Sequence, residues 1–173
     1  MKLLLNRHPS PIGDMLLVSD GAALVALDFH DYEARLMTLL RRYQGECTLV
    51  PQDDAGAAGR CLDAYFDGQI AALDELPVRT GGTDFQRQVW AALRRIPAGG
   101  TTNYGRLAGV IGRPKASRAV GAANGANPVA IVVPCHRVIG ADASLTGYGG
   151  GLHRKAWLLA HEARFAGASG GVG

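Results

Sequence analysis

Residues 128–140 read PVAIVVPCHRVIG, and this stretch decides how the chain is interpreted. The segment 128–133 is short, apolar and rich in β-branched residues, which predicts a buried strand. Directly after it comes Cys135, followed by His136 and Arg137. Positive neighbours lower the pKa of a thiol, and the thiolate is its nucleophilic form. These residues predict a reactive cysteine at the end of a buried strand, and they leave an inert buried cysteine open as the alternative.

His136 is not expected to contact Cys135 directly, because adjacent residues of a strand point to opposite faces. A water molecule or a bend in the chain would have to connect the two side chains. This geometry argues against a simple Cys–His dyad. A thiol hydrolase, recognisable by multiple turnover, stays open as a competing hypothesis.

Three helices are predicted upstream of this stretch, and the last two form a loose helix-turn-helix pattern. Thr83 and Gln86 form a capping box at the start of the first helix, and Thr102 is expected to cap the second. Many helical hairpins that never contact DNA share the pattern. The predicted ranges are 83–96, 104–111 and 115 or 116 to about 126.

The third predicted helix consists largely of alanine and glycine over residues 119–125. Each glycine costs the helix about 1 kcal/mol relative to alanine. A slim helix permits close approach of another surface, which is either a neighbouring helix or the narrow minor groove of DNA. Composition leaves both readings open.

Charge is divided unevenly along the chain. Residues 1–100 carry 10 Lys+Arg against 13 Asp+Glu, a balance of −3, and residues 101–173 carry 8 against 2, a balance of +6. A basic half beside an acidic half indicates that the C-terminal part contacts a polyanion, for which nucleic acid is the natural candidate. A solvated basic face is the other explanation.

The N-terminal half has the alternation of a mixed α/β domain. Strands are predicted at 2–7, 15–19, 22–29 and 48–50, and helices at 32–43 and 57–66. We therefore predict a domain at 1–80, a second at 81–166, and a disordered tail at 167–173.

The three cysteines, Cys47, Cys61 and Cys135, form no CxxC pair, which is typical of a reducing compartment. Cys47 and Cys61 are expected to be core residues. No zinc-ligand set is visible, and no apolar run is long enough to span a bilayer. We expect a cytoplasmic protein that has no metal, no cofactor and no membrane contact.

The segment 134–138, PCHRV, resembles the active-site signature of the O6-alkylguanine-DNA alkyltransferases, the methylated-DNA–protein-cysteine methyltransferases. Residues 1–80 resemble the variable N-terminal domain of that family only in general pattern. Across residues 82 to about 165 further matching blocks follow in the family's order: FQ and VW at 85–90, YG and LA at 104–108, RP and SRAVG at 113–121, NP at 127–128, TGY and GG at 146–151, and K, WLL and HE at 155–162.

The resemblance implies an α/β (α+β) protein. A small ribonuclease-H-like N-terminal domain would precede a mostly helical, winged-helix-like C-terminal domain that carries the cysteine. The implied activity is DNA repair by direct reversal, in which Cys135 takes the alkyl group from O6-alkylguanine, and from O4-alkylthymine, in a single irreversible turnover. A non-catalytic alkyltransferase-like lesion-binding protein and a plain DNA-binding regulator are the competing binding modules.

The resemblance also assigns roles to individual residues. Glu162 would act through His136 and a water on Cys135, Tyr104 would donate a proton near guanine N3, and Asn127 would connect the helix-turn-helix to the reactive segment. Arg118 would fill the space that the flipped base leaves while its helix lies in the minor groove of duplex DNA. The protein would act as a monomer.

The remaining implied site residues fall into two groups. Those expected to contact DNA besides Arg118 are Thr102, Tyr104, Ser117, Ala119, Ala123, Asn124 and Arg137. Those expected to line the substrate pocket are Trp90, Val138, Tyr148, Gly149 and Gly150. Gly149 stands where some family members have a serine, whose hydroxyl can contact guanine O6. In this chain only the backbone amide of residue 149 would be available for that contact.

Overall fold

The computed structural model describes residues 1–142, 145 and 147–170. They form two compact units. The first unit contains Met1–Gly82 together with Pro128–Val132, and the second contains Thr83–Asn127 together with Val133–Gly173. The short return of the chain into the first unit differs from the continuous boundary predicted at residue 80.

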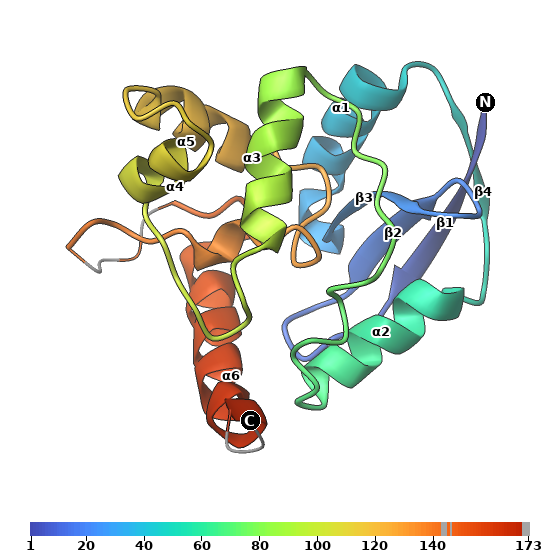
Figure 1. The fold of residues 1–173 in the computed structure, drawn as a ribbon. Coiled ribbons are helices and arrows are strands. Elements are labelled where there is room, and N and C mark those ends of the chain that lie inside the picture. The colour runs from blue at the N-terminus through green and yellow to red at the C-terminus, as the bar shows by residue number, and fades with distance from the viewer. Residues whose placement is uncertain (143–144, 146, 171–173) are drawn as a thin grey trace. The chain divides into compact units, whose positions relative to one another are not determined.

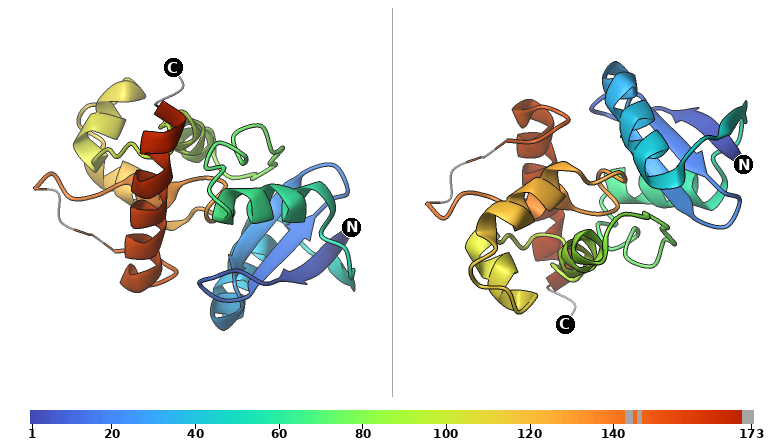
Figure 2. Two further views of the ribbon diagram at one scale, coloured as in Figure 1. Left: turned by 90° about the horizontal axis from the view of Figure 1, so that it is seen from below. Right: turned by 90° about the horizontal axis from the view of Figure 1, so that it is seen from above.

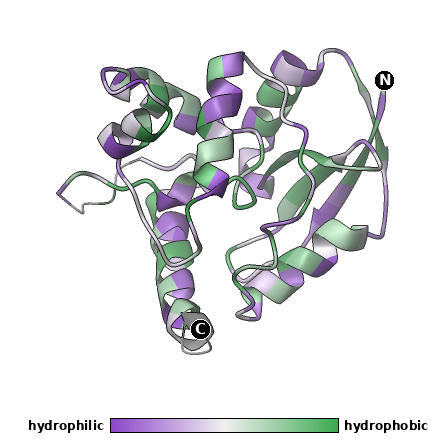
Figure 3. Ribbon diagram, viewed as in Figure 1, coloured by the Kyte–Doolittle hydropathy of each residue, from purple (hydrophilic) through white to green (hydrophobic). Residues whose placement is uncertain are grey.

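The first unit is built on a four-stranded sheet with the order β3-β2-β1-β4. β1 is antiparallel to β2 and parallel to β4, and β2 is antiparallel to β3. Figure 3 shows apolar residues along β2 and β3. The strands are β1 (Lys2–His8), β2 (Met15–Ser19), β3 (Leu24–Phe29) and β4 (Thr48–Pro51), close to the predicted ranges.

Two helices cover opposite faces of this sheet (Figures 1 and 2). A short 3₁₀ turn, η1 (His30–Tyr32), leads into α1 (Glu33–Gln44). Leu36 and Leu40 of α1 pack against Leu3, Val18 and other apolar residues of one face. The second helix is α2 (Gly56–Phe66), which buries Leu62 and Tyr65. Both helices lie where the apolar spacing predicted them.

The second unit is mostly helical, and α3, α4 and α5 pack on one another (Figure 1). The predicted capping box is present, because Thr83 Oγ1 accepts from the Gln86 amide and the Gln86 side chain accepts from the Thr83 amide. The helices are α3 (Asp84–Arg94), α4 (Tyr104–Val110), α5 (Ser117–Gly125) and α6 (Leu152–Gly170). Helix α6 therefore continues past Gly167, where the sequence predicted a disordered tail; residues 171–173 lie outside the described residues.

Thr102 does not cap α4, contrary to the prediction. The Asn103 side chain is the cap, accepting a hydrogen bond from the Arg106 amide at 2.9 Å. Thr102 instead pairs with Val138 in a parallel bridge, where its amide donates to the Arg137 carbonyl and its own carbonyl accepts from Ile139. Asparagine and threonine are both good caps, and backbone pairing decides which of the two is used here.

Residues 128–133 are buried as predicted, but they form turns and not the predicted strand. Only Val129 pairs with a strand, through a parallel bridge to Leu27. The Val132 amide then donates to the Ala130 carbonyl, closing a tight turn around Ile131, whose φ is 69°. A β-branched residue at positive φ is strained. The segment's apolar character had predicted a buried position correctly, since residues 128–133 are all buried.

Candidate functional site

Cys135 lies at the start of a 3₁₀ turn, η2 (Cys135–Arg137), and only 8% of it is exposed. Pro134 before it has φ −83° and ψ 65°, and the Cys135 amide donates to the Val133 carbonyl at 2.8 Å. These are the features of an inverse γ-turn. The cysteine is thus positioned by a turn and not by a strand, so the alternation of strand side chains does not apply to His136.

His136 is fully buried and faces Glu162 of α6. Its Nε2 lies 2.7 Å from Glu162 Oε2. His136 Nδ1 is also buried and has no hydrogen-bond partner among the described residues. The structure therefore joins two of the residues that the resemblance had placed in one relay.

Arg137 holds the other side of the same carboxylate. Its Nε donates to Glu162 Oε1 at 2.8 Å, its Nη2 donates to Oε2 at 3.0 Å, and its Nη1 donates to the Ile96 carbonyl at 2.7 Å. Only 4% of Arg137 is exposed. The prediction that Arg137 contacts DNA is corrected accordingly: its guanidinium group is used inside the protein, where it fixes Glu162.

The charges of this cluster assign the proton of His136. Burial raises the pKa of Glu162, but hydrogen bonds and charges from His136 and Arg137 outweigh it and lower that pKa below its ordinary value. Burial is the largest influence on His136 and lowers its pKa. A neutral His136 beside an ionised Glu162 donates from Nε2, so Nδ1 carries the lone pair. His136 Nδ1 can therefore accept a proton on the side of the ring that faces away from the Glu162 carboxylate.

Lys155 is a buried cation near Cys135 that the sequence analysis did not place in the site. None of its surface is exposed, and its Nζ donates to the Val138 carbonyl at 2.5 Å. Burial lowers the pKa of Lys155, and attraction to Cys135 opposes that shift. A signal was available, because residues 155, 158 and 162 share one helix face and 158 is a leucine.

The glycine-rich loop, Gly149–Gly151, is held in place by a second buried cation that the sequence analysis missed. Arg154 is 7% exposed, and its Nη1 donates to the Gly150 carbonyl at 3.1 Å. Gly150 is buried and Gly149 exposed, while Tyr148 is half-buried with a buried hydroxyl. The predicted pocket residues of this loop thus lie on a segment that α6 holds in place.

Two asparagine side chains, in and just after α5, contact the backbone of residues 133–135, and Trp90 joins α5 to α3. Trp90 Nε1 donates to the Ala123 carbonyl at 2.8 Å, which joins α3 to α5. Asn124 Nδ2 lies 3.5 Å from the Cys135 carbonyl oxygen. Asn127 Nδ2 donates to the Val133 carbonyl at 2.8 Å, in agreement with its expected connecting role. Trp90 is 2% exposed, so it supports α5 from the core of the unit.

The residues predicted to contact DNA separate into exposed and buried sets. Arg118 and Ala119 of α5 are exposed. Ala123 and Asn124, at 3% and 6% exposed, face inward, so their predicted DNA contact is corrected to a packing role. Thr102, Tyr104 and Ser117 are half-buried. Val138, which was predicted to line the substrate pocket, is fully buried.

Tyr104 packs beside the slim helix. A Cβ atom added to Gly121 would lie 3.9 Å from the Tyr104 ring, which is ordinary van der Waals contact. The small residue on this side therefore lets the first residue of α4 approach α5. The exposed side of α5 is equally small, with Ala119, Ala122 and Gly125.

Within the described residues there is no group of three or more His, Cys, Asp or Glu side chains that could hold a metal ion. No helix in that part of the chain is long and apolar enough to cross a membrane. None of the three cysteines forms a disulfide; Cys47 packs against the core of the first unit.

The chain matches two family descriptions along nearly its whole length. Residues 84–164 match the 6-O-methylguanine DNA methyltransferase DNA binding domain, and residues 7–80 match the ribonuclease-like domain of the same proteins. A methylated-DNA–protein-cysteine methyltransferase of Salmonella typhimurium is 48% identical over 166 residues, covering 94% of this chain and 96% of the relative. One from Mycobacterium tuberculosis is 47% identical over 156 residues, covering 88% of each.

Solved structures agree with this assignment. The crystal structure of Mycobacterium tuberculosis OGT in complex with DNA has a TM-score of 0.78 and 40% identity, covering 94% of both chains. An archaeal O6-methylguanine-DNA methyltransferase from Pyrococcus kodakaraensis, at 22% identity and a TM-score of 0.67, shares the fold. The predicted α/β architecture with a ribonuclease-like N-terminal domain is confirmed. The chain belongs to the 6-O-methylguanine DNA methyltransferase family, and residues 84–164 are its DNA binding domain.

Proposed function

We propose that Cys135 is the acceptor for the alkyl group of O6-alkylguanine in duplex DNA. The chain is a DNA-repair protein of the methyltransferase family, and its relatives are named methylated-DNA–protein-cysteine methyltransferases. The observation that carries the assignment of this residue is the buried His136–Glu162–Arg137 cluster next to the cysteine. The non-catalytic alternative is not supported, because its defining feature is the loss of the acceptor cysteine, and Cys135 is present.

The reaction is a displacement at the alkyl carbon. The His136 Nδ1 lone pair takes the thiol proton through a bridging water, and Glu162 stabilises the imidazolium that forms. The Cys135 Sγ–carbon bond forms as the carbon–O6 bond breaks, and its electron pair passes to the guanine. Tyr104 supplies a proton at guanine N3, so a neutral base leaves, and the tyrosinate then regains a proton from solvent while the His136 imidazolium releases one. Lys155 favours the thiolate before the transfer. The thioether is stable, so each molecule reacts once.

Access to the base requires that the nucleotide be flipped out of the helix. The exposed small residues of α5 are suited to the minor groove, and Arg118 on that side is suited to occupy the vacated space. The Gly149–Gly150 segment and Tyr148 form the wall of the base pocket. O4-alkylthymine is a further substrate, and the protein acts as a monomer.

Intact-mass and peptide-mass measurements after incubation with a duplex carrying one O6-methylguanine test this proposal. One methyl group per molecule is expected, on the peptide that contains Cys135. The variant Cys135→Ala should gain none, and the matched variant Cys61→Ala should react as the wild type does. Methylation of Cys47 or Cys61, or no methylation of a folded protein, would overturn the assignment.

A further inference from the structure

Two asparagine side chains, in and just after the last turn of α5, contact the turn that carries Cys135. Asn127 Nδ2 donates to the Val133 carbonyl at 2.8 Å, and Asn124 Nδ2 lies 3.5 Å from the Cys135 carbonyl oxygen. Pro134 stands between these two carbonyls, so the two amides reach both ends of the inverse γ-turn. The connecting role of Asn127 was expected from the resemblance, and the contact of Asn124 was not.

Asn124 is a polar side chain in a place where an apolar one would be more stable. The residue is 6% exposed, and its Oδ1 is buried without a hydrogen-bond partner among the described residues. The opposite orientation of the amide would bring two acceptors, Oδ1 and the Cys135 carbonyl oxygen, to 3.5 Å, so the donor is directed at the cysteine. A buried acceptor without a partner lowers stability, and an apolar side chain would not have one. Packing alone therefore does not account for an amide at this position.

The Cys135 carbonyl is the group through which Asn124 reaches the reacting sulfur. This oxygen also accepts from the Val138 amide at 3.3 Å, which closes η2. Neither contact is short, so the loss of one leaves the Cys135 peptide group less restrained. Rotation of that peptide group moves the Cα–Cβ bond and, with it, Sγ. A reacting group that is displaced by about 1 Å can react about 100-fold more slowly.

Helix α5 carries this contact on its inward face. Arg118 and Ala119 lie on its exposed face, whereas Asn124 points into the unit. Next to Asn124, the Ala123 carbonyl accepts from Trp90 Nε1 at 2.8 Å, which fixes this end of α5 to α3. The helix that is suited to the minor groove thus also contacts the backbone of the acceptor cysteine.

We propose that Asn124 is a positioning residue for alkyl transfer. Its amide restrains the Cys135 carbonyl and thereby keeps Sγ in line with the alkyl carbon of the flipped base. This inference rests on the proposed function, in which Cys135 is the acceptor. Asn124 acts through the backbone of Cys135, so it sets the rate of the chemical step and not the affinity for DNA.

The test replaces Asn124 in the full chain by leucine, which branches at the same atom and has no polar group. The single-turnover rate at a saturating concentration of duplex with one O6-methylguanine should fall about tenfold, because Sγ is less well placed. The reaction with free O6-benzylguanine should slow to a similar degree, since the same sulfur attacks. Affinity for an undamaged duplex and the pH midpoint of iodoacetamide alkylation should not change, and the urea midpoint should not fall. Asn124→Ala removes the same amide without adding volume and should slow both reactions in the same way.

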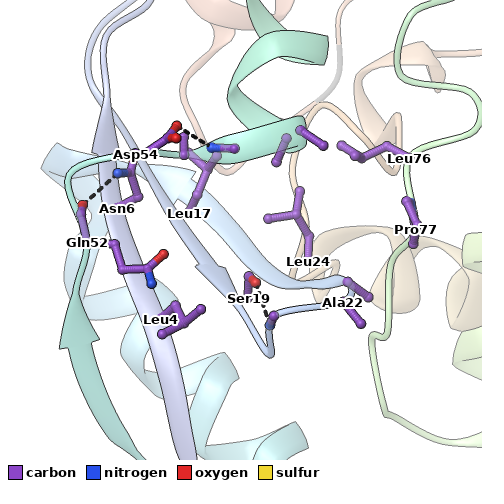
Figure 4. A pocket seen from close by; sticks show the side chains of 16 residues that line it. Leu4, Asn6, Leu17, Ser19, Ala22, Leu24, Gln52, Asp54, Leu76 and Pro77 are labelled. Carbon is purple, nitrogen blue, oxygen red and sulfur yellow. Dashed lines mark hydrogen bonds between the residues drawn. The ribbon is translucent and has the colours of Figure 1, made fainter.

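Asn6 provides a matched control in the first unit (Figure 4). It is 7% exposed, its Nδ2 donates to the Gln52 carbonyl at 2.7 Å, and its Oδ1 is buried without a partner among the described residues. It lines an unfilled cavity of about 290 Å³ and belongs to the unit that does not contain Cys135. Asn6→Leu should therefore leave both reaction rates unchanged, whatever its effect on the urea midpoint.

The outcomes separate the positioning role from the proposed function. If the wild type is not methylated on Cys135, the proposed function fails. If the wild type is methylated and both Asn124 variants react at its rate, only the positioning role is wrong. A rate loss matched by a loss of duplex affinity would assign Asn124 to DNA binding, and a rate loss that Asn6→Leu shares would reflect stability. Either of these two results would overturn the proposal.

Discussion

Arg137 donates to both oxygens of the Glu162 carboxylate, from Nε to Oε1 at 2.8 Å and from Nη2 to Oε2 at 3.0 Å. The Arg137 and Glu162 side chains are 5% and 1% exposed. Paired charges in this arrangement satisfy each other, and removal of one leaves the other buried without compensation. The pair therefore stabilises the folded second unit. It also keeps Glu162 ionised and facing His136 Nε2, so that this nitrogen carries the proton.

Replacement of Arg137 by methionine should lower the free energy of unfolding by about 3–5 kcal/mol, because it leaves the Glu162 charge buried with only His136 beside it. Urea denaturation measures the loss. The control is Arg95→Met, since Arg95 is exposed at the end of α3 and should change stability by less than about 0.5 kcal/mol. Equal losses of unfolding free energy in the two variants would show that the buried Arg137–Glu162 pair adds no more stability than an exposed arginine does.

Glu162→Gln should slow the single-turnover repair rate by about 100-fold, since a neutral amide no longer stabilises the imidazolium. Affinity for an unreactive duplex should not change, which separates a chemical defect from a binding defect. Glu46→Gln, an exposed position, serves as the control. A folded Glu162→Gln protein that repairs at the normal rate would exclude this carboxylate from the chemistry.

The repair rate should fall on the acid side only below pH 6.5, where His136 becomes protonated. Burial lowers the pKa of His136 from 6.5, so the folded protein binds this proton less readily than the unfolded chain does. Stability from this group is therefore complete above pH 6.5 and falls as the pH decreases through the folded pKa. Rate and thermal midpoint, measured from about pH 8 to about pH 5, should both hold to pH 6.5 and then decline. Protonation of His136 above pH 6.5 would contradict the assignment.

Lys155→Met should raise the pH at which the Cys135 thiol ionises by about one unit, because the buried ammonium group attracts the thiolate and a nearby opposite charge lowers a thiol pKa by about that much. The pH dependence of alkylation by iodoacetamide reports the change, with Cys47 and Cys61 replaced by alanine in both proteins. Lys115→Met, at an exposed lysine, is the matched variant and should leave the profile in place. Coincident profiles for wild type and Lys155→Met would remove the lysine from the site.

Arg118→Ala should slow repair in duplex DNA at least tenfold and leave the reaction with free O6-benzylguanine unchanged, since only the duplex has a base stack to fill. Arg106→Ala removes another exposed arginine, on α4, and shows the effect of losing one positive charge. Parallel losses on both substrates would show that Arg118 acts on the cysteine chemistry instead of on the DNA.

Much of the site was predictable, because its residues stand close together in sequence blocks. The PCHRV segment singled out Cys135, and the resemblance correctly paired His136 with Glu162. Arg137 was predicted for the wrong partner: an arginine in a basic half indicates DNA contact, and nothing in the local sequence shows that its side chain turns inward to Glu162, 25 residues away.

Lys155 and Arg154 were not recognised as site residues, although Lys155 belonged to a matching block. A charged residue on a helix is usually exposed, and only packing against η2 and the glycine-rich loop buries these two. The strand predicted at 128–133 failed for a related reason. Apolar, β-branched residues indicate burial, but the turns around Ile131 and Pro134 depend on backbone hydrogen bonds that local propensity does not encode.

By itself, the sequence determined the strands and both α-helices of the first unit, helices α3 to α5 and the capping box of α3, and it predicted Cys135 as the acceptor, because periodicity, caps and short motifs are local properties of the chain. Only the tertiary structure decided which charges are buried, which nitrogen of His136 carries the lone pair, and where the first unit keeps an unfilled cavity. These features depend on side chains that meet across long separations in sequence, where burial and pairing set the energies.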